Sequence, residues 1–235
     1  MEEKLIGIVL NKTEYKENDV IINVFTLEKG VVSASLKGVK KAGAKLKFAS
    51  QPFCFAEFLF SEKSGRRTVT GASLNDSFYP IRESVSGFYA ACAALEFIKK
   101  FLKENIVSEE LFFATVDCLK NIAYGNKKPL KALCVFLLTA LKLSGYALNA
   151  GECFICGGEI SGRVFFDGFS GGFICGKCFN GAGREINIST YDAIKNISLG
   201  REVSEENAKF ALRLLDHYIT VKTDESIKSL KELIK

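Results

Sequence analysis

Four cysteines stand in two closely spaced pairs, and this spacing is typical of a zinc site. Cys153 and Cys156 form one Cys-x-x-Cys pair, and Cys175 and Cys178 form the second pair after a spacer of 18 residues. A two-residue gap lets one tight turn present both sulfur atoms, and zinc binds four thiolates at the corners of a tetrahedron. We therefore predict that these four residues bind one zinc ion.

Two other interpretations of the pairs are buried core thiols and a redox-active Cys-x-x-Cys site. Two pairs at this spacing favour zinc over both. The zinc is expected to be structural, since four thiolates leave no coordination position open for a substrate. About 30 Gly-rich residues around the cysteines cannot form a hydrophobic core unaided, so the metal should hold them together. The backbone should turn sharply at Gly157, Gly158 and Gly176.

The other reactive side chains do not form a catalytic set. Cys54, Cys92, Cys118 and Cys134 lie in apolar segments, which predicts small buried side chains. The single histidine, His217, lies among leucines in a helical pattern, and we expect it to be structural. The sequence lacks the Gly-x-x-x-x-Gly-Lys-Ser/Thr motif that cradles nucleotide phosphates. We therefore predict that the protein is not an enzyme.

A lysine-rich segment is the second candidate site. Residues 37–47 include five lysines, two glycines and no acidic residue. Such a segment gains free energy by releasing counterions when it lies along phosphates. The alternative is a solvated loop that only keeps the protein soluble. The residues predicted to bind nucleic acid are those of this basic loop and a second basic pair: Lys37, Lys40, Lys41, Lys45, Lys47, Arg66 and Arg67.

The first 80 residues must form the β structure that positions the basic loop. Segments rich in Val, Ile, Phe and Thr alternate with turn residues, which predicts five strands. Five short strands suit a small closed barrel, of which the OB-fold is one. The fourth strand is apolar on both faces, so one face should fill the barrel and the other should pack on the next domain. The predicted strands are Lys4–Asn11, Val20–Leu27, Val31–Leu36, Phe53–Phe60 and Arg67–Leu74.

After Pro80, apolar residues recur every three or four positions, which predicts helices. The first begins near Arg82, and the second has Ser108 as its N-cap and ends at Gly125. Within a Gly- and Cys-rich interruption, residues 163–167 and 172–174 predict a zinc-ribbon hairpin. The further helices are predicted at Pro129–Gly145, Thr190–Ser198, Ser204–Lys222 and Asp224–Ile234.

These elements predict an α+β protein in three parts. Residues 1–80 form an OB-fold nucleic-acid-binding domain, residues 81–150 and 184–235 form a helical domain, and residues 151–183 form the inserted zinc ribbon. With 235 residues and 48% hydrophobic content, the chain can bury a substantial core. Its 32 Lys and Arg residues only slightly exceed its 27 Asp and Glu residues, so a polyanionic partner is indicated only where the positive charge is clustered.

The sequence also indicates in which cellular compartment the protein is found. Acidic residues follow Met1 where a signal peptide has basic ones. The most apolar stretch, Leu130–Leu143, contains two lysines and is too short to span a bilayer. We expect a cytoplasmic, nucleoid-associated protein with reduced thiols and no membrane contact.

The order of these parts resembles the RecO family of bacterial recombinational-repair proteins. The resemblance covers essentially the whole chain, and its most specific part is the zinc hairpin that follows Gly145-Tyr146. The matching residues are Gly7, Asn18-Asp19-Val20-Ile21-Ile22, Phe25-Thr26, Gly30, Leu36-Lys37-Gly38, Gln51-Pro52-Phe53, Tyr89, Leu143-x-Gly145-Tyr146, Phe166-Asp167-x-x-x-Gly171-Gly172-Phe173-x-Cys175-x-x-Cys178 and Lys228-Ser229-Leu230.

The resemblance implies a binding protein that acts on DNA in repair. RecO proteins bind single- and double-stranded DNA and anneal complementary strands. They work with RecR, and sometimes RecF, to load RecA onto DNA coated by single-strand-binding protein. Members without the cysteines exist, so zinc is not needed throughout the family. Contact with the acidic, apolar tail of single-strand-binding protein would require a groove in the helical domain.

Two other classes of function remain open at this point. A zinc-ribbon and OB-fold protein could bind RNA or act in transcription, although such modules do not require a large helical domain. A thiol enzyme using a Cys-x-x-Cys pair lacks a histidine base, and bound zinc would occupy its thiolates. A metal assay separates the enzyme from the binding proteins, and strand annealing compared with RNA binding separates the other two.

Overall fold

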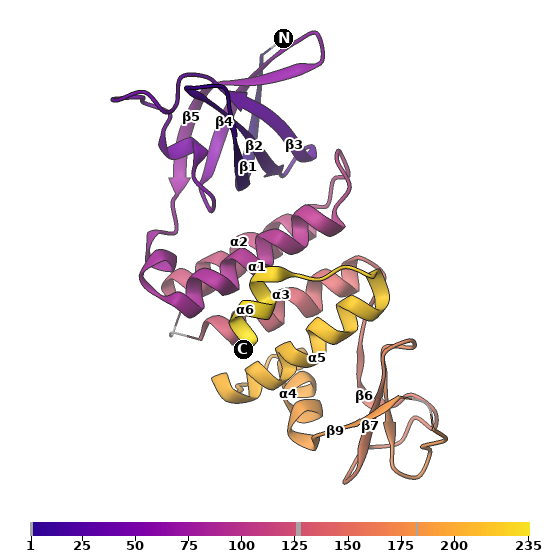
Figure 1. The fold of residues 1–235 in the computed structure, drawn as a ribbon. Helices are drawn as coiled ribbons and strands as arrows, with labels where there is room; N and C mark the ends of the chain where they lie inside the picture. The colour runs from indigo at the N-terminus through magenta and orange to yellow at the C-terminus, as the bar shows by residue number, and fades with distance from the viewer. Residues whose placement is uncertain (1, 126–127, 182) are drawn as a thin grey trace.

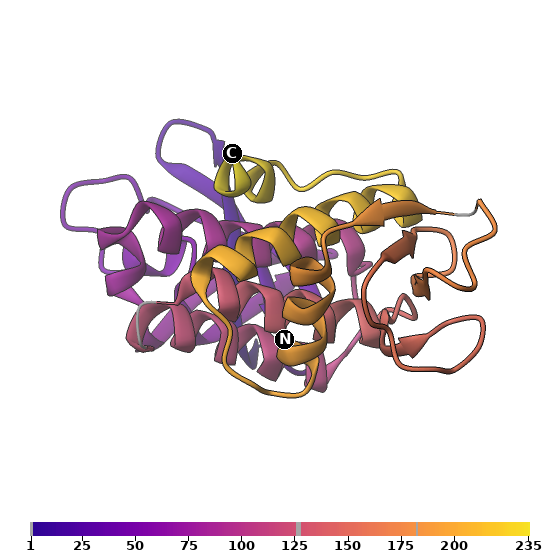
Figure 2. The ribbon, with the colours of Figure 1, turned by 90° about the horizontal axis from the view of Figure 1, so that it is seen from below.

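The structure, a computed structural model, describes residues 2–125, 128–181 and 183–235. A β-barrel lies at one end of an elongated molecule, helices occupy the middle, and a small sheet lies at the other end (Figure 1). Seen from below, the small sheet lies at the side of the helices (Figure 2). This arrangement confirms the predicted α+β class with an N-terminal barrel.

Five strands close the N-terminal barrel in the order β1-β2-β3-β5-β4. The first strand is longer than predicted because it has two partners: residues 2–8 pair with β4 and residues 7–15 pair with β2. An irregularity between Val9 and Asn11 bends it from one partner towards the other. The strands are β1 (Glu2–Tyr15), β2 (Asp19–Thr26), β3 (Gly30–Leu36), β4 (Phe55–Lys63) and β5 (Arg66–Asp76), with a short 3₁₀ helix η1 (Phe48–Ser50) before β4.

Only the end of the fourth strand nearest the helices packs against hydrophobic residues on both of its faces. Its residues Ala56, Phe58 and Phe60 are buried in the barrel core. On the other face, Phe55 packs on Phe112 of the helical part, with ring centroids 6.2 Å apart. Phe55 and Leu59 on that face are both half-buried, but only Phe55 packs against the core shared with the helices. The predicted docking of β4 on the helices therefore holds at its first residues, not along its length.

The helices begin and end largely as predicted. Ser108 accepts a hydrogen bond from the backbone N–H of Leu111, as its N-cap role requires, and Ser84 and Ser204 cap their helices in the same way. The helices are α1 (Val85–Phe101), α2 (Glu109–Tyr124), α3 (Pro129–Leu143), α4 (Ile188–Ser198), α5 (Glu205–Thr223) and α6 (Lys228–Ile234), with a 3₁₀ helix η2 (Tyr79–Glu83) before α1.

The last helix begins four residues later than predicted. Asp224 has a left-handed backbone (φ 56°) and ends α5, so the following residues cannot continue a helix. The N-terminus of α6 is instead capped from a distant helix: the carboxylate of Glu96 in α1 accepts the backbone N–H groups of Lys228 and Ser229 at 2.9 and 3.0 Å. A sequence pattern cannot reveal a cap donated from so far along the chain.

One hydrophobic cluster runs through all three parts of the molecule. It includes Ile8 and Phe25 of the barrel, the inner faces of the helices, and Phe166 and Phe173 of the small sheet. The barrel also has a core of its own. Whether residues 1–80, 81–150 with 184–235, and 151–183 each form a separate domain therefore stays a prediction.

The neighbouring residues Phe112 and Phe113 offer a matched test of the barrel–helix junction. Phe112 is buried and contacts Phe25 edge-on at 5.4 Å, whereas the side chain of Phe113 is exposed. We expect Phe112→Ala to lower the free energy of unfolding by about 3–5 kcal/mol and Phe113→Ala by less than about 1 kcal/mol. Denaturant unfolding measures both. Limited proteolysis should release the barrel faster from the first variant, and equal behaviour of the two would contradict the packing.

Candidate metal centre and nucleic-acid interface

A four-stranded sheet carries the paired cysteines. Its order is β6-β8-β7-β9, and β7 with β8 is the predicted hairpin. The outer strands escaped prediction because one is polar and Gly-containing and the other has only three residues. The strands are β6 (Asn149–Cys153), β7 (Val164–Asp167), β8 (Gly172–Cys175) and β9 (Arg184–Ile186).

The structure brings the four predicted cysteines together. Cys153 ends β6 and Cys175 ends β8, and the four sulfur atoms all lie within 4.8 Å of one another. A tetrahedral zinc with bonds of about 2.3 Å needs sulfur atoms about 3.8 Å apart, so small side-chain adjustments suffice. Cys153 and Cys175 are buried, whereas Cys156 is exposed. This donor set can hold a metal ion, and its chemistry suits zinc.

The first cysteine pair is shaped by one left-handed glycine. Gly157 has φ +67°, and its N–H donates to the carbonyl of Cys153 at 2.8 Å. The N–H of Cys153 in turn donates to the carbonyl of Gly158 at 2.8 Å. Neither Gly158 nor Gly176 has a positive φ. The prediction of sharp glycine turns therefore holds for Gly157, and the other two glycines adopt conformations open to any residue.

Backbone N–H groups stabilise negative charge on a cysteine sulfur of this centre. Burial opposes ionisation of Cys153, but N–H groups of Cys175, Cys156 and Ile155 outweigh it and lower the pKa of this thiol to about 6. The amide of Cys175 lies 3.4 Å from the Cys153 sulfur. Hydrogen bonds with the neighbouring cysteines, Cys156 first, raise the pKa of Cys178 to about 12. A divalent cation would stabilise all four thiolates at once.

The small sheet does not depend on a metal alone, because it shares its core with two helices. Phe173 of β8 packs edge-on against Tyr191 of α4 at 5.1 Å, and Phe166 of β7 packs against Tyr218 of α5 at 5.7 Å. Gly171 lies so close to Tyr218 that an added Cβ would stand 2.5 Å from its hydroxyl. As predicted, the Gly-rich segment around the cysteines does not form a hydrophobic core by itself. Aromatic side chains of α4 and α5 complete that core.

The other cysteines and the histidine lie outside this centre. Cys54, Cys118 and Cys134 are buried, as predicted, and Cys92 is half-buried. Burial raises the pKa of Cys54 to about 12 and that of Cys92 to about 11, so both thiols stay protonated near neutral pH. His217 is half-buried on α5, and burial followed by the charge of Arg184 lowers its pKa.

The basic loop is anchored to the barrel near its start. Val39 is buried in the barrel core, and the N–H of Gly38 donates to the carboxylate of Asp19 at 2.7 Å. Lys40 forms an ion pair with Glu14 of β1, so this lysine is not free of acidic neighbours. The lysine side chains at 37, 40, 41, 45 and 47 are all exposed. The start of the loop is therefore held to the barrel, while the lysine side chains are exposed.

Some of the predicted basic residues are brought together and others are not. Lys37 and Lys41 line a shallow hollow of about 470 Å³ with Lys16, which lies in the β1–β2 turn. Arg66 is exposed at the start of β5, which runs beside the end of β3. Arg67 is half-buried and pairs with Glu62 at 3.2 Å, so its charge is partly neutralised. Lys45 and Lys47 do not line this hollow.

The outer face of β1, β2 and β3 carries hydrogen-bonding side chains that sequence reasoning did not assign to the site. Asn23 donates to Asn11 at 3.1 Å, and the hydroxyls of Ser35 and Thr68 lie 3.1 Å apart. Tyr15 is exposed at the end of β1. In the sequence, alternating apolar and polar residues along the second and third strands indicate that a polar outer face exists. This pattern does not show which side chains lie next to one another on that face.

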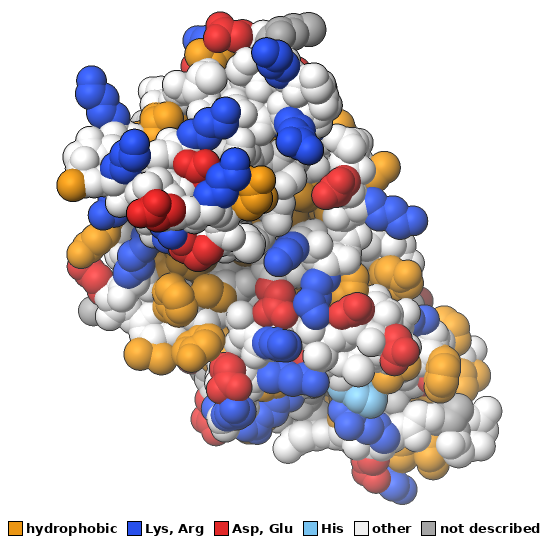
Figure 3. Space-filling model, turned by 45° about the horizontal axis from the view of Figure 1, so that its top comes forward, with side chains coloured by type: hydrophobic (Ala, Val, Ile, Leu, Met, Phe, Trp, Pro, Cys, Tyr) orange, Lys and Arg blue, Asp and Glu red, His pale blue; other side chains and the backbone are white. Residues whose placement is uncertain are grey.

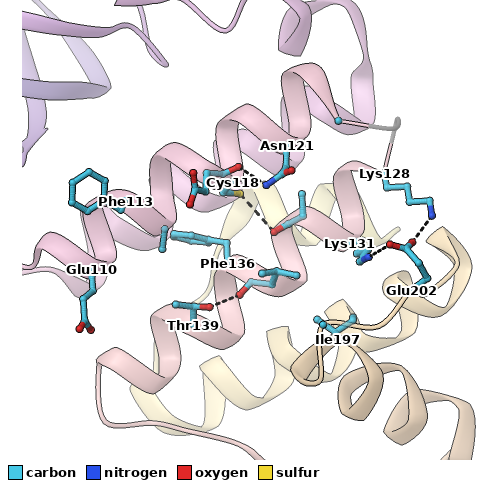
Figure 4. A pocket seen from close by; sticks show the side chains of 16 residues that line it. Glu110, Phe113, Cys118, Asn121, Lys128, Lys131, Phe136, Thr139, Ile197 and Glu202 are labelled. Carbon is cyan, nitrogen blue, oxygen red and sulfur yellow. Dashed lines mark hydrogen bonds and ion pairs between the residues drawn. The ribbon is translucent and has the colours of Figure 1, made fainter.

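A groove of about 660 Å³ runs between α2 and α3 in the helical part (Figure 4). Its lining is partly apolar and includes Val135, Phe136 and Ile197. At one end Lys128 and Lys131 both form ion pairs with Glu202, each at 2.6 Å, as Figure 4 shows.

Among the described residues, no helix combines the length and apolar character needed to cross a membrane.

Comparison with known proteins identifies the family. The chain matches the family models "Recombination protein O N terminal" over residues 1–78 and "Recombination protein O C terminal" over residues 82–231. It is 27% identical to the DNA repair protein RecO of Acetivibrio thermocellus, over 86% of this chain and 84% of that protein. It is 29% identical to the DNA repair protein RecO of Pelotomaculum thermopropionicum, over 96% of this chain and 91% of that protein. With both halves matched, the chain belongs to the RecO family of DNA repair proteins, as the order of its parts indicates.

Proposed function

We propose that this protein is a DNA-binding recombination mediator. It binds and anneals DNA strands and helps to load a recombinase onto DNA coated by single-strand-binding protein, in the repair of double-strand breaks and gaps. Membership of the RecO family supports a role in recombinational repair. The observation that carries the DNA-binding part is the position of the basic loop beside the polar outer face of the barrel.

In this proposal a single strand lies along β1, β2 and β3. OB barrels bind oligonucleotides on the face of strands 2 and 3, with positive charge along the backbone and aromatic rings against bases. Lys37, Lys41 and Lys16 would contact phosphates, and Tyr15 is the exposed ring available for stacking. The Asn23 and Ser35 side chains offer donors and acceptors to base edges. Phosphate contacts carry no base identity, so annealing of any sequence is expected.

The metal has a structural role in this proposal. Cys153, Cys156, Cys175 and Cys178 would hold one Zn²⁺, which fixes the ends of β6 and β8 relative to each other. With four protein ligands, the ion is closed to substrates. We propose no reaction at this centre.

The proposed partners are RecR and single-strand-binding protein, with RecF and RecA as further candidates. The groove between α2 and α3 supports contact with the acidic, apolar tail of single-strand-binding protein, because apolar side chains line it and two lysines stand at one end. Glu110 and Asp117 line it as well and would oppose an acidic partner. Both lysines already bind Glu202, so a carboxylate from the tail would have to replace it.

Strand annealing by the purified protein tests the proposed function. We expect complementary DNA oligonucleotides to anneal at least about tenfold faster with the protein than without it, including when both strands are coated by single-strand-binding protein, since neutralised strands pair more readily. Fluorescence quenching of labelled strands measures the rate. Tight binding of RNA without acceleration of DNA annealing would favour the alternative, an RNA-binding or transcription-associated module.

A further inference from the structure

The shallow hollow beside the basic loop is built by two separate segments of the chain. Lys16 belongs to the turn between β1 and β2, whereas Lys37 and Lys41 belong to the loop that follows β3. Figure 3 shows Lys and Arg side chains gathered over the barrel, at the top of that view, with acidic side chains among them. Two acidic residues, Glu17 and Asp19, line the hollow together with the three lysines. By charge alone, each of these acids would oppose a phosphate group.

The two acidic residues differ in what they contact. Asp19 is half-buried at the start of β2, and its carboxylate accepts the backbone N–H of Gly38 at 2.7 Å. Among the described residues, this is the one hydrogen bond that joins the β1–β2 hairpin to Lys37 or Gly38. Glu17 is exposed, and within the described part of the chain its side chain forms no hydrogen bond or ion pair. Asp19 therefore has a structural partner in the basic loop, and Glu17 does not.

Gly38 is the residue at which the basic loop turns. Its backbone is left-handed (φ +64°), and its carbonyl accepts the N–H of Lys41 at 3.2 Å. The side chain of Lys41 passes close to this turn, because its Cδ lies 3.9 Å from the position of a Cβ added at Gly38. Lys37 directly precedes the turn. A hydrogen bond that holds Gly38 against β2 therefore limits where both lysines can lie relative to Lys16.

Other contacts hold the loop to the barrel just after this turn. Val39 is buried in the barrel core, and the N–H of Lys40 donates to the carbonyl of Asn18 at 3.2 Å. These contacts remain when the hydrogen bond from Gly38 to Asp19 is removed, so the barrel should stay folded. What the removal changes is the turn itself, and the three lysines of the hollow are then no longer held side by side.

We propose that Asp19 is a positioning residue for DNA binding, which assembles Lys16, Lys37 and Lys41 into one subsite for a phosphate of the DNA backbone. Its negative charge weakens the attraction for that phosphate. The gain from ordering the lysines is larger, because a preassembled site loses less conformational entropy on binding. The inference rests on the proposed function, since it takes the ligand of the hollow to be a DNA strand. Removing this acidic side chain should therefore weaken DNA binding, which is opposite to the effect of charge alone.

The test compares three single variants of the full-length protein with wild type in binding a labelled single-stranded DNA oligonucleotide. Asp19→Ala removes both the acceptor and the charge, and it should bind at least about fivefold more weakly than wild type. The slope of the logarithm of its binding constant against the logarithm of salt concentration should be shallower by up to about 1.4, for two lost phosphate contacts. Asp19→Asn keeps an oxygen that can accept the Gly38 N–H, and it should bind at least as tightly as wild type. Glu17→Ala, the matched control, removes the same charge from the same hollow and should also bind at least as tightly.

Amide hydrogen exchange and thermal unfolding connect the binding result to the loop. Exchange in residues 37–41 should rise in Asp19→Ala and not in the other two variants, while all three should unfold at nearly the wild-type temperature. Binding by Asp19→Ala as tight as wild type or tighter would overturn the positioning role. Equal losses in Asp19→Ala and Asp19→Asn, or in Asp19→Ala and Glu17→Ala, would overturn it as well. Failure of wild type itself to bind the oligonucleotide would instead contradict the proposed function.

Discussion

Cys175→Ser is expected to release the metal and to unfold the small sheet locally. Wild-type protein purified without chelator should contain one zinc per chain, since four sulfur atoms within 4.8 Å form a complete ligand set. Structural zinc contributes on the order of 10 kcal/mol or more of apparent folding free energy to small modules, and a hydroxyl is a poor replacement for a thiolate. Metal analysis should find well below half an equivalent in the variant.

The unfolding should stay local, because the barrel has its own core. Amide hydrogen exchange should rise in residues 149–186 and remain slow in β1 to β5. Packing of Phe173 on Tyr191 should keep part of β8 protected. Cys92→Ser is the matched control, because this half-buried thiol lies outside the centre. Wild type with less than about half an equivalent of zinc, or a Cys175→Ser variant that keeps its metal, would contradict the assignment.

Replacing Lys41, Lys45 and Lys47 together by Ala is expected to weaken single-strand binding at every sequence alike. The logarithm of the binding constant falls linearly with the logarithm of the salt concentration, and each lost phosphate contact makes this slope about 0.7 shallower. The slope for the triple variant should therefore be shallower by at most about 2. At about 0.1 M salt this corresponds to roughly a hundredfold weaker binding. Annealing should fall in parallel, because two strands must be neutralised before they pair. A salt titration of oligonucleotide binding measures the slope.

Lys40 is left out of this variant because it pairs with Glu14. Removing it would leave the Glu14 carboxylate without its partner and would add repulsion to any lost contact. The fold should survive the triple change, since these three side chains are exposed while Val39 keeps the loop anchored. The control variant replaces Lys99, Lys120 and Lys142 by Ala, which changes net charge equally on exposed helical positions. An unchanged slope in the folded triple variant would make the loop a solvated surface.

Local patterns in the sequence were enough to predict most elements and the metal ligands. Each Cys-x-x-Cys pair is contained in one turn, so its spacing carries the information by itself. Alternating Val and Ile residues predict the strands, and Ser108 with the acidic residues after it predicts the start of α2. These features depend on neighbours within a few residues, which is the range over which sequence periodicity acts.

Only the tertiary structure decided how distant residues meet. Phe112 and Phe113 are adjacent and chemically identical, yet one packs against Phe25 and the other faces solvent, because the barrel covers only one side of α2. The pairing of Lys40 with Glu14 and the capping of α6 by Glu96 likewise join segments far apart in the chain. The polar face of the barrel arises in the same way. Its side chains come from separate strands, and only the closure of the barrel places them together.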